Sequence, residues 1–411
     1  MTEPSMRWAS GASELADAAF AAEQAMAVAR ESLGEGPVDL AIVFFGAAHV
    51  PHAAEIAATA RRVLAPACLM GASAHGVVTA EHEIEGAPAL SVIAARLPGV
   101  ELKPFIAVRE TWGQAARDPI EFARAAPGAR GAELVLLLVD PFSLPVESVL
   151  QAFNRHAPGV RVVGGMASAG VRPGSNALIL NDWVASEGGA AVAMKGAIRV
   201  DVVVSQGCHP VGPPLEVTRA EGNVLMELDG QPALERAEQV LMELGDEERE
   251  QLKNGLYVGR PVRSGAQGQG DYLIRNLLGA DRDRGLIAIG DHAMRRERIR
   301  LHVRDASTAR EDLELLLSPQ AFYSRAQATL LFACNGRGRG LYGRPDCDIE
   351  TLQSAIGRGV PAAGMFCAGE VGPVGGRNFV HGHTASIAIL RPRLETPVSL
   401  EAGGEAGPRA Q

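Results

Sequence analysis

The chain has 411 residues, of which 47% are apolar and 21% are charged, and it carries a formal net charge of −9. A chain of this length exceeds one ordinary hydrophobic core, so two domains are expected. The acidic balance without a basic block, and an aromatic content of only 4%, argue against nucleic acid and anionic membranes as main partners.

The first 37 residues are predicted to form a helical lead-in. An Ala-rich amphipathic pattern runs from Ser13 to Leu33, and it lacks the features of a signal peptide. No apolar run in the sequence approaches the roughly 20 residues needed to span a bilayer. These features predict a cytoplasmic protein without membrane insertion.

Three copies of one pattern organise the rest of the chain. Each copy has a β-rich run, a helical segment, a short apolar strand, a Gly-x4-Gly turn and a further strand. The β-rich runs are 39–46, 133–140 and 328–336, and the glycine turns are 71–76, 165–170 and 364–369. A strand–helix–strand crossover predicts parallel pairing, and the strand after each turn returns antiparallel. The predicted fold is α/β, with two domains built from repeated strand–helix–strand–glycine turn–strand units and mixed sheets.

The region between the second and third copies has a different pattern. It includes a charged helix near 246–253 and a Gly-rich stretch over 263–270 that is predicted to be a mobile loop. We therefore expect an N-terminal domain over 38–205 and a C-terminal domain over 206–394. The polar, Gly- and Pro-rich residues 395–411 are predicted to be a disordered tail.

The five cysteines are far apart in the sequence and include no CxxC pair, so neither a disulfide framework nor a zinc knuckle is indicated. Cys334 ends a predicted strand, and Asn335 and Arg337 follow it at the edge where open α/β sheets bind ligands. A reactive thiol needs a nearby cation that lowers its pKa, and Arg337 is a candidate for Cys334. The alternative is a small packed apolar residue. Cys208 presents the same two alternatives.

The common catalytic and nucleotide motifs do not fit the glycine turns. None of the three turns continues with the Lys of a P-loop, so nucleotide hydrolysis by that route is not indicated. Ser73, in GASAHG, resembles the serine of a nucleophile elbow, but the second glycine comes one residue late. The alternative is that each glycine lets the backbone turn sharply or approach another segment closely. No cofactor is predicted.

The histidines after the third turn suggest two alternatives. His381 and His383 are two residues apart, so on a strand they share a face, and with Glu370 they form the pattern of a two-His-one-carboxylate metal site. The alternative is that both are polar strand-end residues that bond backbone carbonyls. Because the spacing is common, no metal is predicted.

Two long segments, 205–234 and 364–390, resemble the signature segments of the FIST family. The first half of the chain is similar to the N-terminal FIST domain, and residues from about 222 to 390 are similar to the C-terminal one. The resemblance implies an intracellular sensory protein that binds a small ligand such as an amino acid and signals through a separate protein partner. It supplies no catalytic residues.

With that resemblance, the third glycine turn becomes the predicted ligand site. The Arg377 guanidinium suits a ligand carboxylate, and Glu370 suits an ammonium group. The remaining contacts are assigned to Asn378, His381, His383 and Thr384. The alternative is that Glu370 and Arg377 pair with each other across the turn.

Two rival functions stay open at this stage. One is an enzyme that uses the thiol of Cys334 or Cys208 with a nearby histidine. The other is an interaction scaffold that binds no small ligand. The missing nucleophile, cofactor and metal motifs favour a sensor over an enzyme.

Overall fold

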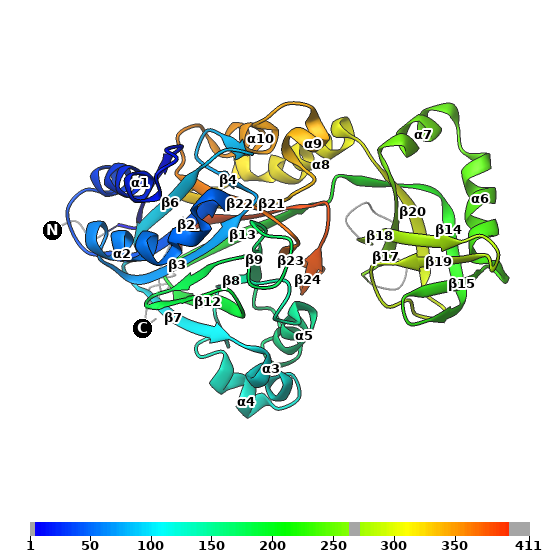
Figure 1. Ribbon diagram of the computed structural model, residues 1–411, viewed down its shortest axis with the longest axis horizontal. Helices are drawn as coiled ribbons and strands as arrows, with labels where there is room; N and C mark the ends of the chain where they lie inside the picture. The colour runs from blue at the N-terminus through cyan, green and yellow to red at the C-terminus, as the bar shows by residue number, and fades with distance from the viewer. Residues whose placement is uncertain (1–4, 263–271, 394–411) are drawn as a thin grey trace, which may run out of the picture.

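The computed structural model describes residues 5–262 and 272–393 (Figure 1). The predicted tail over 395–411 and the predicted mobile loop over 263–270 lie outside the described residues. In Figure 1 one part of the molecule holds the three repeats, and a smaller part with a sheet of its own lies to the right. The mixed α/β fold predicted from the sequence is confirmed.

The three repeats form three sheets of the same topology. The first sheet has the order β1 (Arg7–Ser13), β6 (Leu90–Arg96), β2 (Val38–Gly46), β3 (Pro66–Ala74), β10 (Leu178–Leu180), β11 (Trp183–Ala185). The second has β7 (Val100–Ala107), β12 (Gly189–Gly196), β8 (Leu134–Val139), β9 (Val162–Met166), β23 (Glu370–Val374), β24 (Arg377–His381). The third has β13 (Ile198–Ser205), β25 (Ala385–Pro392), β21 (Ala328–Cys334), β22 (Ala362–Cys367), β4 (Gly76–Val78), β5 (Glu83–Glu85).

The pairing within each sheet follows the predicted rule. The central strand pairs parallel with the strand after its helix, in β2–β3, β8–β9 and β21–β22. The returning strand pairs antiparallel with the central strand, in β6–β2, β12–β8 and β25–β21. Parallel pairing of this kind requires a crossover helix, which the amphipathic segments between the strands provide.

Each sheet is completed by a hairpin from another repeat. Hairpin β10–β11 of the second repeat pairs with β3 of the first, and β23–β24 of the third pairs with β9 of the second. Hairpin β4–β5 of the first repeat pairs with β22 of the third, which closes the cycle. The sequence pattern did not predict this exchange, because it joins segments that are far apart in the chain.

The registers also correct the alignment of the second glycine turn. Gly71, Gly164 and Gly364 lie opposite Val43, Leu137 and Leu331, three equivalent residues of the central strands. A Cβ at Gly164 or Gly364 would lie 1.9 Å from the carbonyl oxygen of the residue opposite. The equivalent glycine of the second repeat is therefore Gly164, one residue before the start of the predicted turn at 165–170.

The three glycine turns contact one another. Ser168 N donates to the Ser73 carbonyl oxygen at 3.2 Å, and Ser168 Oγ donates to the Phe366 carbonyl oxygen at 2.6 Å. Met166 N donates to the Gly369 carbonyl oxygen at 2.8 Å. The turns thus meet where the three repeats join.

Helices cover the outer faces of the three sheets, and the inner faces share one core. The helices beside the first sheet are α1 (Ala18–Leu33), η1 (Ala47–His52) and α2 (Ala53–Val63); beside the second they are α3 (Arg109–Ala115), α4 (Pro119–Ala125) and α5 (Val146–His156); beside the third they are α8 (Ala306–Leu317), η4 (Ser318–Phe322), α9 (Gly338–Tyr342) and α10 (Cys347–Ile356). Between the sheets, Phe44 of β2 meets Phe332 of β21 edge to face, with ring centroids 5.9 Å apart. Burying one such ring contributes about 1.5–3 kcal/mol, so the shared core ties the repeats together.

The N-terminal segment contains more than the predicted helix. Strand β1 precedes α1 and pairs antiparallel with β6 at the edge of the first sheet. The helix begins where the Asp17 side chain accepts from Phe20 N, and it ends at Gly34, whose φ of 79° suits glycine. The lead-in over 1–37 thus supplies both a strand and a covering helix.

The region between the second and third repeats forms a fourth sheet with its own core. Its order is β14 (Cys208–Glu221), β20 (Arg298–Arg304), β17 (Leu256–Pro261), β18 (Tyr272–Asp281), β19 (Leu286–Ile289), β15 (Val224–Leu228), β16 (Gln231–Pro232), and its helices are α6 (Ala233–Glu243), α7 (Asp246–Gln251) and η2 (Leu252–Asn254). We call this region the inserted sheet. After the inserted sheet the chain returns to the third sheet, because β25 pairs with β13, the strand that precedes the inserted sheet. The predicted boundary between 38–205 and 206–394 stays a prediction. The pairing of β13 with β25 joins strands from its two sides.

Among the described residues, no helix combines the length and apolar character needed to cross a membrane. All five cysteines are free.

We predict that Gly364→Ala destabilises the fold by about 1–3 kcal/mol or more, since the new Cβ would lie 1.9 Å from the Leu331 carbonyl oxygen, in a core with no room for it. The matched control is Gly340→Ala, where a Cβ meets nothing within 4 Å in a helix. That change should be neutral or stabilise by up to about 1 kcal/mol. Urea unfolding measures both, and equal effects would contradict the close-approach assignment.

Candidate functional site

The candidate site lies where the third sheet meets the inserted sheet. Cys334 ends β21, and Glu370 begins β23, while Arg304 ends β20 of the inserted sheet and Cys208 begins β14. The carboxyl ends of parallel strands are where open α/β sheets place their ligands. We call the group formed by Cys208, Arg304, Cys334, Arg337, Glu370 and His383 the junction site.

Glu370 is fully buried, and only one of its two carboxyl oxygens has hydrogen-bond partners among the described residues. Its Oε2 accepts from Thr384 N at 3.1 Å and from Thr384 Oγ1 at 2.6 Å. Its Oε1 is buried without a hydrogen-bond partner among the described residues. Burial raises the pKa of Glu370 to about 8, so this carboxyl is largely protonated at neutral pH.

Arg304 presents two free donors to the junction site. Its Nη1 lies 3.2 Å from His383 Nδ1, but its Nε and Nη2 are buried without partners in the described chain. His383 Nε2 lies 2.6 Å from Asn276 Oδ1, and the His383 ring centroid is 4.4 Å from that of Tyr257. Burial, with Arg304 and Arg337 nearby, lowers the pKa of His383 to about 4. The neutral ring therefore accepts from Arg304 and donates to Asn276.

Arg337 is held rigidly and leaves one nitrogen free. Its Nε and Nη2 bond the two Asp348 oxygens at 2.6 and 2.7 Å, and its Nη2 also donates to Tyr342 Oη at 2.6 Å. Its Nη1 is buried without a partner among the described residues, and a Cβ on Gly207 would lie 3.0 Å from it. Because Asp348 balances its charge, Arg337 contributes a hydrogen-bond donor to the site and little net charge.

The first repeat supports this arrangement from behind. Glu83, at the start of β5, accepts from Ile349 N at 2.9 Å, and its own amide donates to Asp346 Oδ1 at 2.6 Å. Burial and the nearby Asp348 raise the pKa of Glu83 to about 8. The exchanged hairpin β4–β5 therefore fixes the start of α10, and Asp348 of α10 in turn holds Arg337.

The two thiols of the junction site are in surroundings that favour the neutral form. Burial raises the pKa of Cys334 to about 11 and that of Cys208 to about 12, although Arg304 acts in the opposite direction on both. A Cβ on Gly336 would lie 3.2 Å from Arg304 Nη1 and 3.9 Å from Cys334 Sγ, which places the guanidinium and the thiol together. The predicted lowering of the Cys334 pKa by Arg337 does not occur.

The structure brings some of the predicted ligand residues together. Cys208, Cys334, Arg337, Glu370 and His383 are in the junction site. Thr384 holds Glu370, and Asn335 is exposed directly after Cys334.

The other predicted residues lie elsewhere. Glu370 pairs with His381 at one end of hairpin β23–β24, and Arg377 pairs with Val374 at the other, so Glu370 and Arg377 do not meet. Arg377 is exposed, with its guanidinium carbon 5.8 Å from the Phe379 ring centroid. The hairpin therefore does not bring together the two side chains that were predicted to bond one ligand, and it does not form the alternative ion pair between them.

Asn378, His381 and Ser73 make contacts that hold the backbone. Asn378 Oδ1 accepts from Val162 N at 2.8 Å, and its Nδ2 donates to the Val160 carbonyl oxygen at 2.9 Å. His381 Nε2 lies 2.9 Å from the Gly372 carbonyl oxygen, and Ser73 Oγ accepts from Ala177 N at 2.9 Å. Among the described residues, no group of three or more His, Cys, Asp or Glu side chains is arranged to hold a metal ion.

Two cavities that share part of their lining lie beside the junction site. The one that we call the inner cavity, of about 150 Å³, is lined by His383 of the junction site and by Asn276, among others. The one that we call the outer cavity, of about 280 Å³, shares Glu147, Arg275 and Val380 with it. Both have one wall from the inserted sheet and the other from α5 and β24, so they lie between the two parts of the molecule.

Of the residues that the inserted sheet contributes, the sequence pattern predicted only Cys208. Arg304, Asn276 and Tyr257 come from β20, β18 and β17, and nothing in their local sequence distinguishes them from ordinary strand residues. Each becomes informative only when the inserted sheet is placed against the third repeat.

Two family models match the chain, and the boundary between them falls within the inserted sheet. The FIST N domain matches residues 39–231, and the FIST C domain matches residues 233–373. An uncharacterized protein of Mycobacterium tuberculosis is 39% identical over 389 residues, 94% of this chain and all of the relative. One of Mycobacterium bovis is 38% identical over 395 residues, 95% of this chain and all of the relative. A solved cyanuric acid hydrolase covers 94% of this chain and 99% of its own, at 8% identity and a TM-score of 0.31, too low to support any inference.

We predict a pH dependence of stability that Glu370 causes. In the folded state the pKa of Glu370 is about 8, whereas its ordinary value is 4.5. The protonated carboxyl therefore contributes its full share of the unfolding free energy below pH 4.5, and this contribution is lost as the pH rises through 8. Relative to Glu370→Gln, the wild type should lose about 3 kcal/mol of unfolding free energy between pH 5 and 8. Urea unfolding at several pH values measures this. Glu311→Gln, an exposed change, is the control, and a pH-independent difference between wild type and Glu370→Gln would refute the assignment.

Proposed function

This chain belongs to the FIST family, and on that premise we propose that it is a sensory protein that binds a small polar ligand at the junction site and signals through a separate protein partner. FIST domains are regarded as sensor domains. The proposal concerns the ligand, its place and the signalling role. Action in the cytoplasm stays a prediction.

One observation carries the proposal. Buried polar atoms of Arg304, Arg337 and Glu370 lack hydrogen-bond partners in the described chain, and both guanidinium groups lie near enough to Glu370 to act against the rise of its pKa. Leaving such an atom unpaired costs about 1–3 kcal/mol, so sites of this kind are explained by a ligand or by ordered water. A ligand that bonds several of these atoms at once recovers that cost on binding.

The chemistry of the free atoms favours an amino-acid-like ligand. A ligand carboxylate accepts from Arg304 Nε and Nη2, with Arg337 Nη1 as a further donor. An ammonium group donates to Glu370 Oε1. Because Glu370 is largely protonated before a ligand binds, binding of the ammonium group releases the Glu370 proton to solvent.

The position of the junction site suggests how binding is communicated. Cys208 and Arg304 belong to the inserted sheet, and Cys334 and Glu370 belong to the third repeat. A ligand that bonds Arg304 and Glu370 together links the two parts and favours one relative placement of them. The signalling partner would recognise that relative placement of the inserted sheet and the third repeat.

The first test is a thermal-shift screen against amino acids and related metabolites. A ligand at 100 times its Kd stabilises the fold by about 2.7 kcal/mol. We expect Arg304→Met and Glu370→Gln to abolish the shift while both variants still unfold cooperatively. Arg377→Ala, in the outer cavity, should keep it.

The Arg377 variant separates two placements of the ligand. Loss of the shift in Arg377→Ala, with the shift kept in Arg304→Met, would move the ligand to the outer cavity and refute the junction site. A flat screen on folded protein would favour an interaction scaffold that binds no ligand, which then predicts a stable partner in pull-down experiments.

The rival enzyme with a nucleophilic thiol gives a second prediction. With a pKa of about 11 in place of 9.0, Cys334 has about 100-fold less thiolate than an ordinary cysteine at neutral pH. We expect alkylation of Cys334 and Cys208 by iodoacetamide at pH 7.5, followed by mass spectrometry, to be at least that much slower than alkylation of free cysteine. Alkylation faster than that of free cysteine would support the enzyme.

A further inference from the structure

One buried amide beside the junction site is unpaired at both of its polar atoms. Gln206 lies between β13 and β14, where the chain passes from the third sheet to the inserted sheet, and it is 4% exposed. Its side-chain Nε2 and Oε1 are both buried without a hydrogen-bond partner among the described residues. Because an unpaired buried amide is costly, a group of this kind is explained by a ligand or by ordered water. The proposed function has not yet used this side chain.

The strand register places Gln206 beside the acid of the junction site. The last pair of β13 with β25 is Ser205 with Ala385, so the next residues along the two strands are Gln206 and Thr384. Residues that lie opposite each other in an antiparallel pair have their side chains on the same face. The Thr384 hydroxyl donates to Glu370 Oε2 at 2.6 Å. The Gln206 amide is therefore directed to the face on which Glu370 lies.

Two neighbours of Gln206 in the chain support this direction. Val204, two residues earlier and hence on the same face of the strand, lies against β23, since a Cβ on Gly372 would be 2.7 Å from Val204 Cγ2. Gly207, the next residue, lies against the unpaired nitrogen of Arg337, because its own Cβ would be 3.0 Å from Arg337 Nη1. The amide thus lies between Arg337 and the hairpin that begins with β23.

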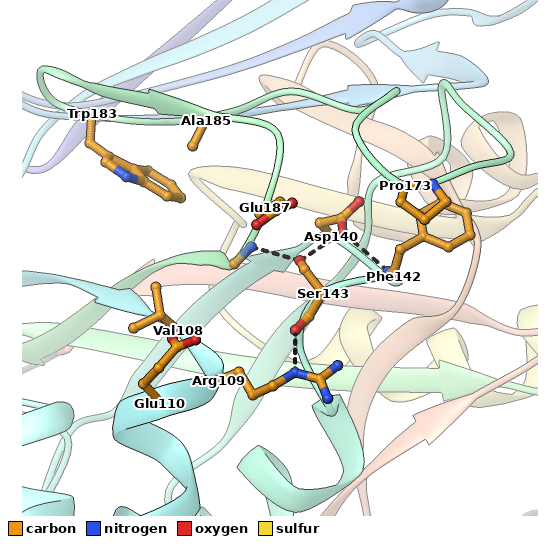
Figure 2. Close-up of a pocket in the computed structure, with 11 residues that line it drawn as sticks. Val108, Arg109, Glu110, Asp140, Phe142, Ser143, Pro173, Trp183, Ala185 and Glu187 are labelled. Atoms are coloured by element: carbon orange, nitrogen blue, oxygen red, sulfur yellow. Dashed lines mark hydrogen bonds between the residues drawn. The ribbon is translucent and has the colours of Figure 1, made fainter.

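The equivalent place in the second repeat holds a polar group that the chain itself satisfies. Asp140 follows the central strand of the second repeat as Cys334 follows that of the third. Figure 2 shows how Asp140 accepts from Ser143 Oγ, at 2.7 Å, and from Phe142 N, at 3.1 Å. Its other carboxylate oxygen accepts from Asn176 Nδ2 at 3.0 Å. Unpaired atoms at this edge of the sheet are therefore not a general consequence of the repeat, and those at the junction site point to a ligand.

The two free atoms of Gln206 define the group that completes them. A primary amide offers one acceptor oxygen and an NH2 donor, so its full complement is a second amide, which pairs with it through two hydrogen bonds. A carboxylate accepts from Nε2 but has no proton for Oε1, and an ammonium group donates to Oε1 but cannot accept from Nε2. An apolar group leaves both atoms unpaired.

We infer that the junction site selects an amino acid with a carboxamide side chain, the class of glutamine and asparagine, and that Gln206 determines this selectivity. The ligand carboxamide donates to Gln206 Oε1 and accepts from Gln206 Nε2. The inference rests on the proposed function, in which Arg304 and Glu370 bind the carboxylate and ammonium groups that all amino acids share. Gln206 adds the chemical class of the ligand's side chain.

The test is a calorimetric titration of the full chain with five amino acids. L-glutamine and L-asparagine are compared with their acid counterparts, L-glutamate and L-aspartate, and with L-methionine. We expect one of the two amides to bind most tightly. Its acid counterpart and methionine should bind at least about ten-fold more weakly, because each leaves a buried atom of Gln206 unpaired.

The outcomes separate this inference from the proposed function. Binding of an acid or of methionine as tight as that of the better amide would overturn the selectivity and leave the proposed sensor standing. Binding of none of the five amino acids up to about 10 mM would overturn the inference as well. The proposed function fails only if the wider thermal-shift screen is also flat.

A variant pair tests the role of Gln206 itself. Gln206→Leu should weaken binding of the preferred amide at least about ten-fold and leave binding of methionine equal or tighter. Because leucine removes both unpaired atoms, the ligand-free variant should be at least as stable to urea as the wild type. Gln239→Leu, an exposed change on α6, should leave the preference for the amide unchanged. An equal loss of amide and methionine binding in Gln206→Leu would show a structural role and overturn the inference.

Discussion

The structure depends on one constraint, which is that the backbone of each sheet edge must find hydrogen-bond partners. Strands β3, β9 and β22 each end a four-stranded unit and would expose a row of amide and carbonyl groups. A hairpin from a different repeat pairs with each of them, at Gly71, Gly164 and Gly364. Since each repeat supplies the hairpin that another requires, and since the inner faces share one core, the three repeats form a single body.

That exchange also positions the chemistry of the junction site. The hairpin that begins at Glu370 is anchored on β9 of the second repeat, and Glu83 of the first repeat's hairpin fixes the start of α10, whose Asp348 holds Arg337. Contacts between repeats therefore set the places of both an acid and a guanidinium. The inserted sheet adds Arg304 from the other side, so the site is complete only when both parts are in place.

Equivalent positions of the repeat hold different chemistry. Asp140 and Cys334 each follow the last residue that the central strand pairs with its returning strand, but the second repeat places a buried carboxylate there. The third places a thiol between buried guanidinium groups and a carboxyl. The backbone of the repeat determines where a site lies. The side chain at the end of the central strand, and the walls that neighbouring elements supply, determine what it can bind.

The sequence alone determined the features that local patterns encode. Periodicity and glycine positions predicted the three strand–helix–strand units, their parallel crossovers and the mixed α/β class, and two signature segments identified the family, which the domain matches confirm. Local patterns carry this much because they record which face of an element is buried and where the backbone must turn. Only the tertiary structure decided the hairpin exchange, the one-residue shift to Gly164, the separation of Arg377 from Glu370 and the entry of Arg304 into the site. The hairpin exchange joins strands more than a hundred residues apart in the chain. The other three depend on the register in which strands pair and on which surfaces meet, and no local pattern records those choices.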